Sequence, residues 1–224
     1  MNGRHEYKHE LNYTDYFLLR NRLKTILPRD ENGDENGEYI VRSLYFDTPG
    51  DKALREKIDG VDKREKFRIR RYIGTDDLLR MEKKSKLRGL CYKQSSQITE
   101  KQLKDLSKGD LKWMRTSENS LILELYSKMT GQILQPKTIV EYVREAYTYK
   151  PGNVRITLDR NIRTGLFSKD FLSDELPMIN AGDHLFLLEV KYDAFIPDFI
   201  VKLLQLGNRS VTACSKYTLC RIYG

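Results

Sequence analysis

Polar and apolar residues alternate along several stretches of the chain, which is the pattern of β-strands with one polar and one apolar face. The clearest stretch is EKFRIRRY at residues 65–72. Read as a strand, it has a basic face and a mostly apolar face: Lys66, Arg68, Arg70 and Tyr72 on the first, and Phe67, Ile69, Arg71 and Ile73 on the second. The basic face is directed either to bulk water or to something that needs positive charge.

The same alternation predicts strands at 4–11, at 78–86, in a hairpin formed by 138–149 and 154–162, and at 184–193. Their charged faces carry Arg4, Glu6, Lys8 and Glu10; Arg80, Glu82, Lys84 and Lys86; Arg144, Arg155 and Asp159; and Glu189 and Lys191. Pro151 and Gly152 predict the turn of the hairpin, and a further strand is expected at 39–48. These five predicted strands, like the strand at 65–72, therefore have a charged face with an apolar face behind it.

Helices are expected between and after these strands. The first is predicted at 14–28 with Thr14 as its N-cap, and a second begins after Thr99, where TEKQ has the form of a capping box. Another runs through 120–129 and ends at Gly131. Two more close the chain, at 197–207 with Gly207 as the stop and at 211–223. Because no linker or shift in composition interrupts the pattern, residues 1–224 are predicted to form a single α+β domain.

Two arrangements of the strands satisfy the alternation. An open sheet could expose its charged face to water and pack helices on the other face. Alternatively, the sheet could close into a barrel with a charged interior and helices around its outer wall. The charged faces are rich in Arg, whose forked guanidinium suits phosphate oxygens, and this favours the barrel.

Composition narrows the class of partner. Lys and Arg outnumber Asp and Glu by 40 to 32, which gives a formal net charge of +8 and indicates an anionic partner. No apolar run approaches the roughly 20 residues of a membrane span, and the first residues lack the apolar core of a signal peptide. Three cysteines without zinc-type spacing (Cys91, Cys214 and Cys220) fit a reduced protein, so a cytoplasmic location is expected.

Carboxylates recur beside the basic residues in a fixed spacing. Glu6, Glu82 and Glu189 each stand two residues before a lysine on the same predicted face. A carboxylate beside bound phosphate is unfavourable unless a divalent cation lies between them. The repeated Glu-x-Lys pattern therefore indicates a phosphate site that also takes a metal ion.

The sequence resembles the triphosphate tunnel metalloenzymes, which belong to the CYTH-like superfamily. Within them it resembles the VTC domain of polyphosphate polymerases. The matching stretches, in order from residue 4 to 221, are RHEYKHEL, RSLYFDT, REKFRIRRY, MEKKSK, VREAY, VRITLDRNIRTG, LEVKYD and SKYTLCR. Each is weak alone, but their order over nearly the whole chain makes the resemblance specific.

The resemblance implies a closed antiparallel barrel of about eight strands, a triphosphate tunnel with surrounding helices. It implies a transferase that moves the terminal phosphoryl of ATP onto inorganic polyphosphate with Mn²⁺ or Mg²⁺. The implied partners are ATP and polyphosphate or triphosphate. A membrane partner is compatible with the family, although the chain itself shows no transmembrane segment.

The resemblance also assigns residues. The implied phosphate-binding set is Lys8, Arg68, Arg70, Lys84, Lys93, Arg144, Arg155, Lys191, Ser215 and Lys216. Glu189 matches the metal-coordinating glutamate, with Glu6 and Glu82 as further candidate ligands, and Glu189, Arg68, Arg70 and Lys84 are the implied catalytic residues. Arg4 stands where many tunnel enzymes have a first glutamate, which argues against a second metal and against hydrolysis through it.

Other functions remain open from the residues. A tri- or polyphosphate hydrolase needs the same lining, and a non-catalytic polyphosphate-binding module needs the same grip. Nucleic acid is not expected as a partner, because the aromatic residues fall mostly on the apolar faces and leave no stacking platform. Asp159 is expected either to pair with Arg144 across the hairpin or to act in catalysis. Outside the charged faces, we expect His5 and His9 to point outward, and Tyr45, Phe46 and Asp47 to form core and turn.

Overall fold

One antiparallel sheet dominates the protein. The structure, a computed structural model, describes residues 3–74, 78–166, 168, 170–182, 185–206 and 214–222. Within these ranges the strands are β1 (His5–Leu11), β2 (Glu38–Asp47), β3 (Arg64–Ile73), β4 (Leu79–Leu87), β5 (Leu90–Ile98), β6 (Gln135–Tyr149), β7 (Val154–Thr164), β8 (Ile179–Asn180) and β9 (Phe186–Tyr192). The helices are α1 (Tyr13–Ile26), α2 (Lys52–Ile58), α3 (Glu100–Ser107), α4 (Lys112–Arg115), α5 (Ser120–Gly131), α6 (Asp198–Leu203) and α7 (Lys216–Ile222).

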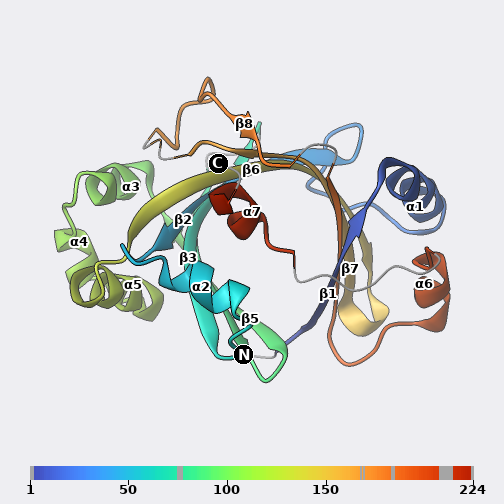
Figure 1. Cartoon of the computed structure of the whole chain (residues 1–224), viewed down its shortest axis with the longest axis horizontal. Coiled ribbons are helices and arrows are strands. Elements are labelled where there is room, and N and C mark those ends of the chain that lie inside the picture. The colour runs from blue at the N-terminus through green and yellow to red at the C-terminus, as the bar shows by residue number, and fades with distance from the viewer. Residues whose placement is uncertain are drawn as a thin grey trace.

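The sheet curls into a ring. Its strand order is β1-β9-β7-β6-β2-β3-β4-β5, with the short β8 added beside β7. Irregular pairing between Tyr45 and Phe46 and between Glu141 and Val143 interrupts the central ladders, and such bulges bend a sheet. The two edge strands meet at one bridge, where Arg4 and Cys91 exchange two backbone hydrogen bonds of 3.0 Å. Figure 1 shows the resulting ring of strands around a central space.

The curl confirms the predicted barrel-like α+β fold and excludes an open, flat sheet. In the described part of the chain, the ladder between the edge strands does not extend beyond the Arg4–Cys91 bridge. The ring is therefore closed at one point rather than along a full strand pair.

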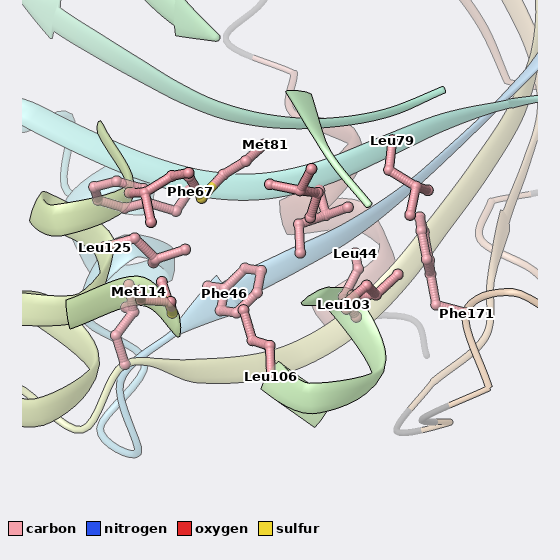
Figure 2. Close-up of a cluster of buried hydrophobic side chains, with 14 of the residues drawn as sticks. Leu44, Phe46, Phe67, Leu79, Met81, Leu103, Leu106, Met114, Leu125 and Phe171 are labelled. Atoms are coloured by element: carbon pink, nitrogen blue, oxygen red, sulfur yellow. The ribbon is translucent and has the colours of Figure 1, made fainter. Parts of the chain in front are cut away.

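Helices cover the outer wall of the ring on two sides (Figure 1). On one side, α3, α4 and α5 pack on the apolar faces of β2, β3 and β4 in a large core. Figure 2 shows its centre: Leu44, Phe46, Phe67, Leu79, Met81, Leu103, Leu106, Met114, Leu125 and Phe171. On the other side, α1 and α6 pack over β7 and β9 in a second core. The apolar halves of the alternating strands thus bury themselves under helices, which leaves the charged halves inside.

α7 lies within the ring of strands rather than outside it (Figure 1). Its Tyr217 and Cys220 pack against inward residues of β2 and β6, including Tyr45 and Tyr142. The Tyr217 hydroxyl donates a hydrogen bond of 2.6 Å to Asp47 Oδ2, which fixes the helix to the end of β2. The C-terminal helix therefore narrows the interior.

Several predicted helix ends are confirmed and others are wrong. Thr99 forms the predicted capping box with Gln102, and α5 ends at Gly131 as expected. Thr14 is not the N-cap of α1, because Asn12 takes this role and its side chain accepts a hydrogen bond from the Asp15 amide at 2.8 Å. Asn and Thr are both good caps, so the residue types did not distinguish the two positions.

The last two helices are shorter than predicted. α6 ends at Leu203, before the expected stop at Gly207, which lies outside the described residues. α7 begins at Lys216, so Ser215 precedes the helix instead of lying on it, and residues 211–213 are also outside the described part. Of the helices in the described residues, none is both long and apolar enough to cross a bilayer.

The turn of the hairpin was predicted from the sequence, whereas β5 and α2 were not. Gly152 has φ of 72° in the 150–153 turn, and a Cβ there would lie 2.4 Å from the Phe195 carbonyl oxygen, so the predicted turn requires glycine. β5 was not predicted, because this edge strand is largely polar and only partly buried along its length. α2 was also missed, since it is only seven residues long and none of its residues is buried.

The first prediction concerns the core under α5. Leu125 is fully buried at 0% exposure, whereas Leu123 on the same helix is 39% exposed. Replacing Leu125 by Ala removes buried apolar surface and leaves a cavity, so we expect the free energy of unfolding to fall by about 2–5 kcal/mol. Leu123→Ala changes the same residue type in the same helix and should cost less than about 1 kcal/mol. Urea denaturation followed by circular dichroism measures both, and equal losses would show that the core does not lie under this face.

Candidate functional site

The inward faces of the strands enclose a cavity of about 800 Å³. Among the described residues, its lining includes twelve Lys or Arg side chains and three glutamates. The excess of positive charge follows from strand alternation, because the charged residues of β1, β3, β4, β6, β7 and β9 share the inner face. The answer to the question posed by EKFRIRRY is that Lys66, Arg68, Arg70 and Tyr72 all face this cavity.

The strand register brings like charges together. Lys66, Lys84 and Lys93 stand opposite one another on β3, β4 and β5, and Arg70 stands opposite Arg80. Side chains directly opposite in a sheet lie within about 5.5 Å at Cβ, so these pairs repel one another unless anions lie between them. Three groups of carboxylates supply part of the required negative charge.

The first group is centred on Glu82, which is 1% exposed. Arg68 contacts Glu82 Oε2 through Nε at 2.8 Å and through Nη2 at 2.6 Å, and Lys93 pairs with the other oxygen. Burial would raise the pKa of Glu82, but Arg68, Arg70 and Lys93 outweigh it and hold the pKa well below its ordinary value. Arg70 Nε, 3.8 Å from Glu82, is buried and makes no hydrogen bond within the described structure. One guanidinium N–H of Arg70 thus has no acceptor among the described residues.

The second group joins β1, β4 and β9. Lys84 Nζ lies 2.6 Å from Glu6 Oε2, Lys8 lies 2.9 Å from Glu6 and 3.5 Å from Glu189, and Lys191 pairs with Glu189. Burial would raise the pKa of both glutamates, yet the lysines hold both pKa values below the ordinary range. The two carboxylates therefore stay charged side by side.

The third group involves the hairpin and α7. Arg144 makes a forked contact with Asp159, with Nε to Oδ1 at 2.6 Å and Nη2 to Oδ2 at 2.8 Å. Lys216 Nζ also lies 2.6 Å from Asp159 Oδ2. Of the two roles expected for Asp159, the structure shows the ion pair with Arg144. At the other end of β7, Arg155 pairs with Asp30 and donates a hydrogen bond of 2.9 Å to the Tyr39 hydroxyl.

The structure brings the sequence-predicted residues to this one cavity. The following line it: Glu6, Lys8, Arg68, Arg70, Lys84, Lys93, Arg144, Arg155, Glu189, Lys191, Ser215 and Lys216. Glu82 lies directly beneath, bound to Arg68 and Lys93. Glu82 therefore has partners of its own and does not belong to the pair formed by Glu6 and Glu189.

The cavity has further lining residues outside the set that the family resemblance assigned. Lys66 and Arg80 line it, and strand alternation had placed both on the charged faces. Tyr72 was expected on the basic face and does line the cavity, where Tyr39, Tyr45, Tyr92 and Tyr142 join it. Their ring faces and hydroxyls give the cavity a polar aromatic component.

The predictions for YFDT and for the histidines are confirmed in part. Phe46 lies in the core and Asp47 accepts hydrogen bonds from the Thr48 and Ala53 amides, as expected for core and turn. Tyr45 instead faces the cavity, where its hydroxyl accepts a hydrogen bond of 2.9 Å from Arg68 Nη1. His5 stacks on Tyr192 with ring centroids 5.0 Å apart and does not line the cavity.

The carboxylates around the cavity are the candidate ligands of a metal ion. In the part of the chain that the structure describes, no group of three or more His, Cys, Asp or Glu side chains is placed to hold one. Glu6 and Glu189 nevertheless share Lys8 and Lys191 as partners and so lie close together. One or two carboxylates together with substrate phosphates are the usual ligands of Mg²⁺. The Glu6–Glu189 pair fits such a metal, provided that phosphate oxygens complete the site.

Comparisons with known proteins agree with this geometry. The sequence model of the VTC domain family matches residues 3–222. Among curated proteins, no sequence matches the chain.

Solved structures share the fold at low sequence identity. The putative adenylyl cyclase HpAC1 from Hippeastrum, described as having a dominant triphosphatase activity, is similar with a TM-score of 0.57 and 16% identity over 98% of this chain and 95% of that one. The PH1012 protein from Pyrococcus horikoshii OT3 is similar with a TM-score of 0.52 and 12% identity over 96% and 98% of the two chains. These similarities concern the fold alone.

The second prediction tests the cavity as an anion site. Tripolyphosphate that binds the folded state should raise Tm, because at a concentration of one hundred times Kd it adds about 2.7 kcal/mol to the free energy of unfolding. Sodium chloride of equal ionic strength should not raise Tm. Arg155→Met should reduce the shift, because Arg155 lines the cavity. Arg163→Met is the matched control, since Arg163 also lies on β7 and pairs with a carboxylate, Glu141, but does not line the cavity. Thermal melts in the presence of chelator measure all three proteins; an unchanged wild-type Tm would exclude the cavity as a phosphate site.

Proposed function

Because the chain belongs to the VTC domain family, we propose that it is a metal-dependent polyphosphate polymerase, which transfers the terminal phosphoryl group of ATP onto inorganic polyphosphate. The observation that carries the proposal is the enclosed cavity, in which twelve Lys and Arg side chains face three glutamates among the described residues. A chain of phosphates carries negative charge on every unit, and this repeated charge matches the many Lys and Arg side chains of the lining. The proposal treats residues 1–224 as one tunnel domain.

The basic residues would bind and align the two substrates. Arg68 and Arg144 are each held by a carboxylate through two nitrogen atoms, so their guanidinium groups are fixed before a ligand enters. Fixed cations stabilise the charge of a transferring phosphoryl group without reorganisation at the moment of reaction. Arg70, Lys84 and Lys191 extend this grip across the cavity. Donor and acceptor chains are thereby held in line.

The reaction requires no nucleophile from the protein. An oxygen of the terminal phosphate of the acceptor attacks the γ-phosphorus of ATP and forms the new phosphorus–oxygen bond. The bond between the γ-phosphorus and the β–γ bridging oxygen breaks, and ADP leaves with the electron pair. The work of the side chains is to position these groups and to neutralise charge.

Glu189 and Glu6 are the residues that would hold Mn²⁺ or Mg²⁺. When bound there, the ion supplies charge neutralisation between phosphate groups. Glu82 is excluded from this proposed set, because Arg68, Arg70 and Lys93 already surround it.

Hydrolysis of tri- or polyphosphate is the second candidate. A protein of similar fold from Hippeastrum is described as having a dominant triphosphatase activity. Water in place of the acceptor phosphate would use the same basic lining, so the products distinguish the two activities. A module that binds polyphosphate without turnover is the third outcome.

The third prediction separates these functions. With ATP, Mn²⁺ and a short polyphosphate primer, we expect lengthening chains on a gel and release of ADP in equal amount to the phosphate incorporated. Release of free phosphate without longer chains would establish the hydrolase instead. Folded protein that binds polyphosphate but consumes no ATP and releases no phosphate would establish the binding module.

The fourth prediction distinguishes metal binding from phosphate binding. Glu189→Gln keeps the size of the side chain but removes its charge, so turnover with Mn²⁺ should fall by about a hundredfold or more while polyphosphate affinity in chelator holds or increases. Arg68→Ala should weaken affinity and turnover together. Glu65→Gln is the control, because Glu65 pairs with Lys83 and Lys128 and does not line the cavity. Near-normal turnover of Glu189→Gln would show that Glu189 does not serve the metal.

A further inference from the structure

Lys66 differs from the other lysines that line the cavity. Among the described residues these are Lys8, Lys66, Lys84, Lys93, Lys191 and Lys216. Five of them pair with a carboxylate: Lys8 and Lys84 with Glu6, Lys93 with Glu82, Lys191 with Glu189, and Lys216 with Asp159. Lys66 makes no ion pair within the described part of the chain, so no carboxylate described there supplies its counter-charge.

The surroundings of Lys66 are aromatic, hydroxylic and cationic. Its Nζ lies 3.4 Å from Ser215 Oγ, 5.7 Å from the ring centroid of Tyr45 and 5.9 Å from that of Tyr217. The two rings attract a cation only weakly compared with a carboxylate. Charged neighbours come from three strands: Lys8 on β1, Arg68 on β3 and Lys84 on β4. All three of these neighbours are positive.

This environment disfavours the charged amine. Burial lowers the pKa of Lys66; a phenolate at Tyr45 would raise it, but burial and the repulsion from Lys8, Lys84 and Arg68 outweigh this and lower the pKa from 10.5 to about 7. At Tyr45 burial acts in the opposite direction, but Arg68, Lys66 and Arg70 outweigh it and lower the pKa of the phenol to about 7. Near neutral pH the Lys66 amine and the Tyr45 hydroxyl are therefore only partly protonated.

We propose that Lys66 and Ser215 form a phosphate subsite at the α7 end of the cavity, and that the Lys66–Tyr45 pair gains a proton when a phosphate group enters it. The phosphate supplies the counter-charge that no carboxylate of the described residues provides here, and the Ser215 hydroxyl donates a hydrogen bond to it. A new negative charge beside Lys66 stabilises the ammonium form and destabilises a phenolate at Tyr45. Both effects act in the same direction, toward uptake of a proton.

The coupling has a defined sign. A group whose pKa rises on binding favours the bound state at low pH, where it is already protonated, and this contribution is lost as the pH rises above the pKa of the free form. Phosphate binding should therefore be strongest below about pH 7 and weaken as the pH increases. The inference rests on the proposed function only in taking a phosphate chain as the ligand, and it holds for polymerase, hydrolase and binding module alike.

The test is calorimetric binding of tripolyphosphate in chelator, in two buffers of different ionisation enthalpy and at a series of pH values. Lys66→Arg is the central variant, because Arg keeps the charge but does not release its proton in this range. Between pH 6 and pH 8 the Kd of the wild type should rise about tenfold more than that of Lys66→Arg, since one pKa unit corresponds to a tenfold change. Wild type should also take up more protons on binding at pH 7. The protonation of the ligand itself is common to both proteins and cancels in the comparison.

Two more variants keep the test independent of the folding of any single protein. Lys66→Met should bind more weakly at every pH, without the additional rise in Kd. Ser215→Ala should bind more weakly with the proton uptake of the wild type. Circular dichroism confirms folding in each case. If all variants show the pH dependence and proton uptake of the wild type, the inference is overturned while the proposed function stands; if the wild type does not bind tripolyphosphate, both fail. Proton-coupled binding without turnover would support the inference and contradict the proposed enzyme.

Discussion

Repulsion between like charges is the constraint on which the rest of the structure depends. Alternating strands place twelve Lys and Arg side chains of the described residues around one cavity, where water cannot separate them fully. The protein lowers this repulsion by sharing a few carboxylates among several cations. Glu82 serves two arginines and a lysine, Glu6 serves three lysines, and Asp159 serves Arg144 and Lys216. Removing one such carboxylate would leave several cations unbalanced, as expected for a buried ion network.

The incomplete balance is what suits the cavity to an anionic chain. The carboxylates fix the guanidinium groups of Arg68 and Arg144, so little ordering remains when a ligand arrives. At Glu6 and Glu189 a metal ion would compete with Lys8 and Lys191 for the same oxygens, and a lysine released from its glutamate could then contact phosphate. Lys66 is the extreme case among the lysines of the cavity, because it pairs with no carboxylate of the described residues. Lysine side chains at defined positions of the cavity are thus able to bind an anionic ligand.

Much of this arrangement could be predicted from the sequence, and the failures have physical causes. Alternation correctly assigned the inner faces of β1, β3, β4, β6, β7 and β9, because side chains point to opposite sides of any strand whatever the sheet does. It could not separate an open sheet from a ring, since closure depends on bulges such as that at Tyr45 and on contact between edge strands distant in sequence. Ser215 and Lys216 lie outside the strands, so only the family resemblance assigned them. Tyr45 was misjudged because its ring suits an apolar core while its hydroxyl bonds to Arg68 in the cavity.

The account makes one central claim, that the cavity inside the ring receives a phosphate chain. A crystal structure of the protein with tripolyphosphate and Mn²⁺ tests this claim most directly, because the phosphorus positions and the anomalous signal of manganese can both be located. The account predicts phosphate groups inside the cavity, in contact with Arg68, Arg70 and Arg144, and manganese beside Glu189. Phosphate bound only on the outer surface, with the cavity free of it at saturating concentration, would contradict the account.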